Sequence, residues 1–168
     1  IDYVGAQFYL SGTVKLNEAF KVGAELLYAL GTDDADEEQL TNLGNWGWTF
    51  APMSNNTPLA GDWSFAADAN PFDPTGDSAG VQGITLSADY KVMDALALGA
   101  KVGYFTPEEG DATTIDDITS FNVWASYMLA TNTEFAIAYF YNDVDDDDPA
   151  TTYTDEENTI EARLVVNF

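Results

Sequence analysis

The feature that most constrains the fold is a strict alternation of apolar and polar residues, which recurs along the chain. From Val4 to Leu16 the even positions are apolar or small, and the odd positions are mostly polar. A period of two over this length predicts a β-strand with one apolar and one polar face. Similar runs predict seven strands, paired as successive hairpins. They cover residues 4–16, 20–30, 84–92, 96–104, 121–129, 135–141 and 160–168.

The predicted connections alternate between short and long. Three-residue turns at 17–19, 93–95 and 130–132 follow the first, third and fifth strands, whereas the other connections span 31–80, 106–118 and 143–158. A soluble sandwich of two sheets would also alternate. Short turns on one side and long loops on the other are instead typical of a transmembrane barrel.

Aromatic residues of the apolar register gather near both ends of the strands, with aliphatic residues between them. A membrane places amphipathic rings at its two interfaces, whereas a sandwich core has no reason to sort them this way. The pattern therefore predicts an all-β fold, a transmembrane antiparallel up-and-down β-barrel. The aromatic residues are Phe20, Tyr90, Tyr127, Phe135 and Phe168 near the turns, and Phe8, Tyr28, Tyr104, Phe121, Tyr139 and Tyr141 near the long connections.

Composition excludes several classes of function. The chain has no His and no Cys, which removes Ser-His-Asp triads, thiol nucleophiles and His or Cys zinc sites. A net charge of -24 would repel nucleic-acid phosphates. We therefore expect neither an enzyme nor a nucleic-acid partner, and no cofactor.

The five basic residues all fall in the polar register, together with four acids of the strands. If the apolar face meets lipid, this register lines a lumen. Any lumen needs polar residues for solvation, but Lys101 and Arg163 lie well inside the band and would contribute to the field that a solute feels. The predicted pore-lining residues are Lys15, Lys21, Glu25, Asp89, Lys91, Lys101, Glu134, Glu161 and Arg163.

Most of the 29 acidic residues lie in the long connections and predict an acidic extracellular rim. One dense run invites a cation-binding interpretation, although it lacks the central Gly and distal Glu of a helix-loop-helix calcium site. A solvated, repulsive surface is one interpretation, and weak divalent-cation binding is the other. The run contains Asp143, Asp145, Asp146, Asp147 and Asp148.

The final strand carries a terminal aromatic preceded by apolar residues at every second position: Leu164, Val166 and Phe168. This pattern resembles the C-terminal assembly signal of bacterial outer-membrane barrels, and the whole chain resembles outer-membrane porins. The resemblance implies residence in the bacterial outer membrane, insertion by the outer-membrane assembly machinery, contact with its lipid, and passive diffusion of small hydrophilic solutes or ions. Homo-oligomerisation is left open.

Strand number leads to a further expectation. Barrels of this class have an even number of strands and both termini in the periplasm. Seven strands would start the chain outside the cell, so we expect residues 1–168 to be the C-terminal part of a barrel of about 16–18 strands. The rival is a single barrel domain closed by parallel pairing of its first and last strands.

The connection 31–80 is expected to be a long extracellular loop or a loop folded into the lumen. Alternating aromatics at Trp46, Trp48 and Phe50 and at Trp63 and Phe65 suggest a short hairpin within it. Folded inward, this connection would set the pore size. The alternative function is a plugged structural or adhesin-type barrel that acts through acidic extracellular loops.

Overall fold

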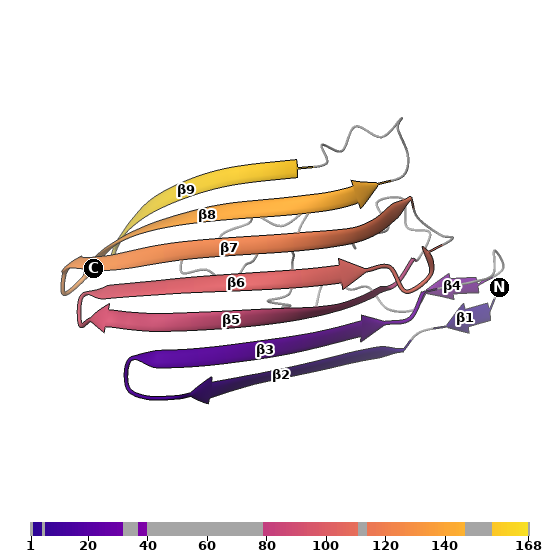
Figure 1. The fold of residues 1–168 in the computed structure, drawn as a ribbon, viewed down its shortest axis with the longest axis horizontal. Coiled ribbons are helices and arrows are strands. Elements are labelled where there is room, and N and C mark those ends of the chain that lie inside the picture. The colour runs from indigo at the N-terminus through magenta and orange to yellow at the C-terminus, as the bar shows by residue number, and fades with distance from the viewer. Residues whose placement is uncertain are drawn as a thin grey trace.

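The computed structural model describes residues 2–4, 6–31, 37–39, 79–110, 114–146 and 156–167. Seven strands form one antiparallel up-and-down sheet, in the order β2-β3-β5-β6-β7-β8-β9 (Figure 1). The all-β prediction and the number of strands in the sheet are confirmed. The strands are β2 (Gln7–Lys15), β3 (Phe20–Ala29), β5 (Val81–Met93), β6 (Leu96–Thr106), β7 (Ile115–Ala130), β8 (Thr133–Asp146) and β9 (Glu156–Val166).

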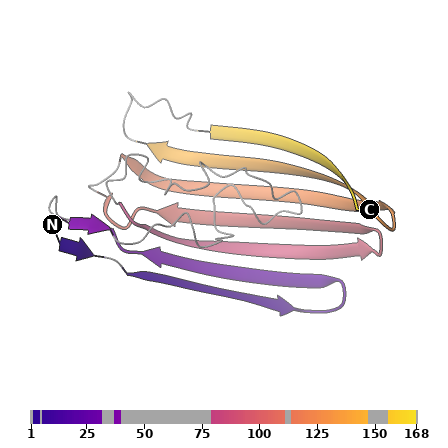
Figure 2. The same ribbon diagram turned by 180° about the vertical axis from the view of Figure 1, so that it is seen from behind.

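The sheet is open. Its edges are β2 and β9, which lie on opposite sides in both ribbon views (Figures 1 and 2), and the described strands do not close into a barrel. Because each strand is antiparallel to the next, the first and seventh strands run in the same direction.

The three short turns lie together at one end of the sheet, as predicted (Figure 1). The first is held by Asn17, whose Oδ1 accepts hydrogen bonds from the backbone N–H groups of Ala19 (2.8 Å) and Phe20 (2.9 Å). Asn side chains favour such turns because they can replace a backbone acceptor. We call this end of the sheet the turn end, and the opposite end the loop end.

Several strand boundaries differ from those predicted. The first strand of the sheet begins at Gln7, not at Val4; the latter belongs to β1 (Asp2–Val4), which pairs in parallel with β4 (Glu37–Gln39). In addition, β7 begins at Ile115 and β8 continues to Asp146, so the connection between β6 and β7 is shorter than expected. The predicted hairpin between Trp46 and Phe65 lies outside the described residues.

The sequence alternation places the acid-rich ends of β7 and β8 in the connections 106–118 and 143–158. They nevertheless pair across the sheet, with Thr119 opposite Asp143 and Asp117 opposite Asp145. A register shift between Ile115 and Asp117 allows the ladder to continue. The carboxylates of Asp143 and Asp145 stay exposed, so the strand extends beyond the apolar region without burying a charge.

Candidate functional site

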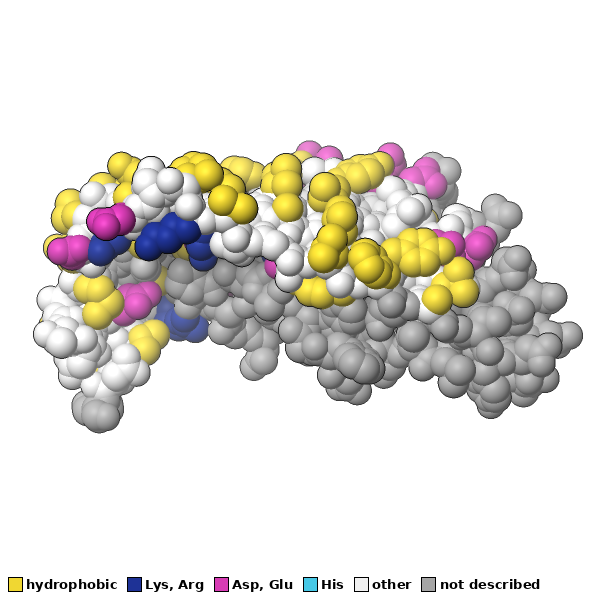
Figure 3. All heavy atoms as spheres, turned by 90° about the horizontal axis from the view of Figure 1, so that it is seen from below, with side chains coloured by type: hydrophobic (Ala, Val, Ile, Leu, Met, Phe, Trp, Pro, Cys, Tyr) yellow, Lys and Arg dark blue, Asp and Glu magenta, His cyan; other side chains and the backbone are white. Residues whose placement is uncertain are grey.

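The two faces of the sheet differ in exposure. We call the face that carries the apolar register the outward face, and the face that carries the polar register the inward face. On the outward face the side chains of Leu26, Leu98 and Ile137 are 41–42% exposed. Val22, Ala24 and Ala100 share this register and are partly exposed. These residues do not fill the interior of a sandwich, and Figure 3 shows hydrophobic side chains gathered along the upper surface. An exposed apolar face of this extent indicates an interaction surface.

The outward aromatic residues do not follow the hydrogen-bonded rows of the sheet. One such row begins with aliphatic residues on β2, β3 and β5, reaches an aromatic on β6 and ends on acids. Its members, from β2 to β9, are Leu10, Leu26, Ile84, Tyr104, Thr119, Asp143 and Glu156. The loop-end boundary of the apolar band therefore crosses the rows obliquely.

The turn-end boundary crosses the rows in the same sense. A second row starts with an aromatic pair, whose rings meet edge to face with centroids 6.3 Å apart, and continues into aliphatic residues. Its members, from β3 to β9, are Phe20, Tyr90, Leu98, Ala125, Ile137 and Ala162. Both aromatic boundaries thus cross the rows in the same sense and enclose an aliphatic band.

If the apolar band lies in a flat apolar layer, the edge of that layer follows the aromatic boundary. The slope of the loop-end boundary then gives the tilt of the strands from the layer normal. The loop-end aromatics move from Tyr28 on β3 to the row of Phe121 and Tyr141 on β7 and β8. That is about one residue per strand, which corresponds to a strand tilt of about 35°. From Phe20 to Tyr28, β3 rises about 26 Å, or about 21 Å along the layer normal at this tilt.

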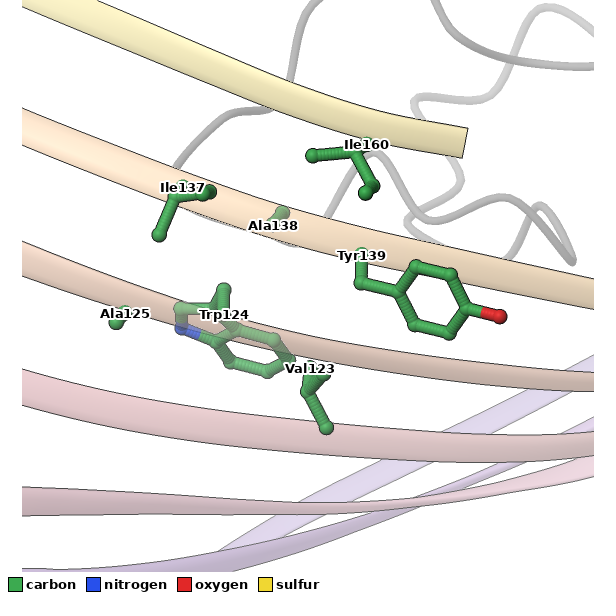
Figure 4. A pocket seen from close by; sticks show the side chains of 7 residues that line it. All are labelled: Val123, Trp124, Ala125, Ile137, Ala138, Tyr139 and Ile160. Carbon is green, nitrogen blue, oxygen red and sulfur yellow. The ribbon is translucent and has the colours of Figure 1, made fainter. Parts of the chain in front are cut away.

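A shallow depression lies on the outward face between β7 and β8 (Figure 4). It forms where the small side chain of Ala125 stands beside larger neighbours, including Ile137, Tyr139 and Ile160. Among the described residues, the phenol of Tyr139 is the only titratable group that lines it, and its hydroxyl donates a hydrogen bond to Asn158 Oδ1. The depression can therefore offer van der Waals contact but little acid–base chemistry.

The predicted pore-lining residues share the inward face of the sheet, as the register of the strands requires. They occupy the alternate positions to the outward apolar residues on every strand concerned. The residues brought together on this face are Lys15, Lys21, Glu25, Asp89, Lys91, Lys101, Glu134, Glu161 and Arg163. Their role in lining a pore stays a prediction.

Three of the inward residues form a buried cluster in the middle of the sheet. Lys101 Nζ on β6 lies 2.7 Å from Glu25 Oε2 on β3, and Thr85 Oγ1 on the intervening β5 donates to the same oxygen over 2.8 Å. The Lys101 side chain is only 5% exposed, and that of Glu25 is 18% exposed. Lys101 is therefore not an isolated cation, because the carboxylate offsets its charge locally.

The turn end carries exposed charges. Lys21 pairs with Asp89 at 2.9 Å, and Lys91 pairs with Asp94 at 2.6 Å; both pairs are well exposed to solvent. Figure 3 shows Lys and Arg side chains gathered toward this end. The hydrogen bond from Lys91, with its positive charge, lowers the pKa of Asp94 below the ordinary value of 3.8. These contacts are screened by salt and contribute little to stability.

Toward the loop end the inward face is buried and partly apolar, which the sequence analysis did not predict. Ser120, Asn122 and Asn142 are at most 3% exposed, and Ser120 Oγ donates to Asn142 Oδ1 over 2.8 Å. Two apolar clusters flank these polar residues. One contains Leu27, Ala29, Ala79, Val81, Phe105, Ile115, Ile118 and Val144, and the other contains Trp124, Ala136, Ala138 and Phe140.

Glycines of the polar register make room for the inward aromatic rings. A Cβ added to Gly99 would overlap the indole of Trp124, which lies directly opposite on β7. A Cβ on Gly103 would lie 2.6 Å from the ring of Phe105, and one on Gly83 would also meet that ring. Glycine within a strand often marks such a close approach, so this signal was present in the sequence.

The remaining predicted residues are only partly described. Leu164 and Val166 lie on β9 and are exposed, whereas Phe168 lies outside the described residues. Within the aspartate run, Asp143 and Asp145 are exposed on β8, and 147–148 lie outside the described part of the chain. In that part no group of three or more acidic residues is placed to hold a metal ion. Weak cation binding by the run stays a prediction.

Among the described residues, no helix is long and apolar enough to cross a membrane. The chain matches no protein-family model, no curated protein and no solved structure.

Proposed function

We propose that the sheet is part of the wall of a bacterial outer-membrane β-barrel, and that the barrel is a passive diffusion channel for small hydrophilic solutes or ions. The observation that carries this proposal is the exposed aliphatic band between two aromatic boundaries that cross the hydrogen-bonded rows in the same sense. Its implied tilt of about 35° and height of about 21 Å are close to the 35–45° and about 25 Å typical of outer-membrane barrels.

A soluble partner would not require this geometry. A protein that covered the outward face would not require both aromatic boundaries to slope in the same sense, whereas a flat lipid layer does. Lipid also tolerates the unbroken run of exposed aliphatic side chains, because it is itself apolar. Outer-membrane lipid and the assembly machinery of that membrane are therefore the proposed partners.

Closure requires further strands, because an open edge in lipid leaves backbone groups without hydrogen-bond partners. Since β2 and β9 run in the same direction, an antiparallel connection between them needs an odd number of additional strands. A total of about 16–18 strands meets this condition when the count is even. The inward polar residues then face the lumen.

The plugged barrel is a second candidate, favoured by the burial of the inward face. A freely hydrated wall would expose its polar side chains, yet Thr85, Lys101 and Asn142 are at most 5% exposed. At the turn end Lys21 and Lys91 remain exposed. Because these inward side chains are buried, the space for water next to the loop-end half of the sheet is narrowed or filled. A narrowed channel and a plugged barrel differ only in whether a continuous water path remains.

Planar-bilayer recording of the complete protein separates these two functions. Ohmic single-channel steps are expected for a diffusion channel, and their size would report the narrowest part of the path. Silence in the presence of demonstrably inserted protein would contradict the channel and support the plugged barrel. Insertion is established independently by protection of the outward face from a water-soluble reagent, for example at a Cys introduced in place of Leu98.

A further inference from the structure

The chain leaves the sheet after β3 and returns at β5, and these two points lie side by side. Ala29, the last residue of β3, is opposite Val81, the first of β5, and Ala29 is fully buried. The connection between β6 and β7 begins at the same loop end, next to this junction (Figure 1). Three strand ends are therefore gathered at one place.

A single residue, Glu108, contacts both sides of that junction. Its Oε1 accepts a hydrogen bond from the Tyr28 hydroxyl at 2.6 Å, and its Oε2 accepts one from the Gly31 backbone N–H at 2.8 Å. On the other side, the backbone N–H groups of Glu108 and Glu109 donate to the Ala79 carbonyl at 3.0 and 2.8 Å. Glu108 thus joins the outgoing chain to the returning chain.

The backbone is tightly packed at this junction, around Gly80. Gly80 has a φ of +64°, a conformation that favours glycine. A Cβ at this position would overlap the Gly31 nitrogen and would lie 2.6 Å from the Ala29 carbonyl oxygen and 2.9 Å from Glu108 Cβ. The backbones on the two sides are therefore packed against each other and against the stem of Glu108.

We propose that Glu108 is a positioning residue, which clasps the two ends of the connection 32–78 to each other and to the loop that begins at Pro107. A carboxylate suits this task because it offers two acceptor oxygens to two donors in different directions. Glutamine has the same shape, but it could keep both contacts only by donating to the Tyr28 oxygen and accepting from Gly31 through a neutral oxygen, so the charged acceptor is lost. The clasp does not depend on whether the sheet lines a pore.

Hydrogen exchange of the Gly31 amide tests the clasp in the full chain. In Glu108→Gln we expect this amide to exchange about tenfold faster, since a hydrogen bond to a charged acceptor is replaced at best by one to a neutral amide oxygen. Glu109→Gln is the matched control, because the Glu109 contact to Ala79 is made by its backbone, and it should leave the Gly31 rate unchanged. The Met128 amide, bonded to Ala95 at the turn end, is the internal reference.

Faster exchange at Gly31 alone supports the clasp. An unchanged Gly31 rate in Glu108→Gln, or equal acceleration by Glu109→Gln, overturns it. Acceleration at Met128 as well as at Gly31 also overturns it, because the effect is then global unfolding. If Glu108→Gln does not fold, Tyr28→Phe is the second test, because it removes one donor that orients the Glu108 carboxylate. Faster exchange of the Gly31 amide in Tyr28→Phe supports the clasp, and an unchanged rate overturns it.

Discussion

At the scale of single residues, several glycines of the inward face carry a steric requirement, because they face aromatic rings. Gly99→Ala should destabilise the protein by about 1–3 kcal/mol, because the added Cβ must displace the Trp124 indole. Gly12→Ala is the control: nothing lies within 4 Å of its Cβ position, and a change below about 0.5 kcal/mol is expected. Denaturant unfolding measures both, and equal effects would contradict the packing of Trp124 on Gly99.

The buried pair of Lys101 and Glu25 should differ sharply from the exposed pair at the turn end. Lys101→Met leaves the Glu25 carboxylate partly buried without its cation, so we expect a loss of about 2–4 kcal/mol of unfolding free energy. Lys21→Met removes the exposed partner of Asp89 and should cost less than about 1 kcal/mol. Comparable losses in the two variants would show that burial of Lys101 has no energetic consequence.

The turn between β5 and β6 should respond to acid through Asp94. Because its pKa is lowered in the folded state, its contact with Lys91 stabilises the fold above the unfolded pKa and is lost as pH falls through the folded pKa. In Lys91→Met the pKa of Asp94 should rise toward 3.8. Carboxyl NMR titration reads this directly, with Lys21→Met as the control in which the pKa of Asp94 stays low.

At the scale of strands, alternation was enough to predict each strand of the sheet but not where several of them end. The centres of β3, β5 and β6 alternate cleanly, so one face and one register follow from the sequence. The ends of β7 and β8 carry Asp117, Asp143 and Asp145, whose charges resemble those of a loop. Cross-strand hydrogen bonds, which depend on the partner strand, extend the ladder there regardless of side-chain polarity.

The outward face gives a test of lipid contact that does not depend on conductance. Leu86 in the middle of β5 and Leu129 near the turn end of β7 are 51% and 58% exposed. In a bilayer, Leu86→Arg should cost about 2–4 kcal/mol and Leu129→Arg about 0–1 kcal/mol, because the cost depends on depth. Unfolding from lipid vesicles measures the difference. In a water-exposed sheet the two substitutions would be equally mild, which would contradict the membrane proposal.

At the scale of the whole molecule, the candidate site was only partly predictable. Alternation places Lys101 and Arg163 on the inward face, as the register confirms, but it says nothing of burial. The pairing of Lys101 with Glu25 spans three strands, so it depends on register across β3, β5 and β6 together. The polar side chains of Asn122 and Asn142 give no sign of burial in the sequence, yet both are fully buried.

If the sheet lines the proposed channel, ion selectivity should follow from how charge is divided between the wall and the long connections. The three long connections contain many acids and no Lys or Arg, whereas the wall cation Lys101 is neutralised by Glu25. We therefore expect a weak cation preference at about 0.01 M salt, where the Debye length is about 30 Å, fading toward none near 1 M. Reversal potentials across a salt gradient measure it. Strong anion selectivity at low salt would mean that basic wall residues dominate the acidic connections.

The obliquity of the aromatic boundaries has a mechanical consequence. The sheet is about 29 Å wide, because its strands are about 4.8 Å apart. Suppose that it turned in its own plane until the hydrogen-bonded rows were parallel to the apolar layer. One edge would then rise by on the order of 15 Å relative to the other. In the proposed bilayer, Tyr28 and Tyr139 share the loop-end interface, so this rotation would move one ring out toward water and the other into the hydrocarbon. Both displacements are unfavourable, and the rings would therefore oppose rotation of the sheet in its own plane.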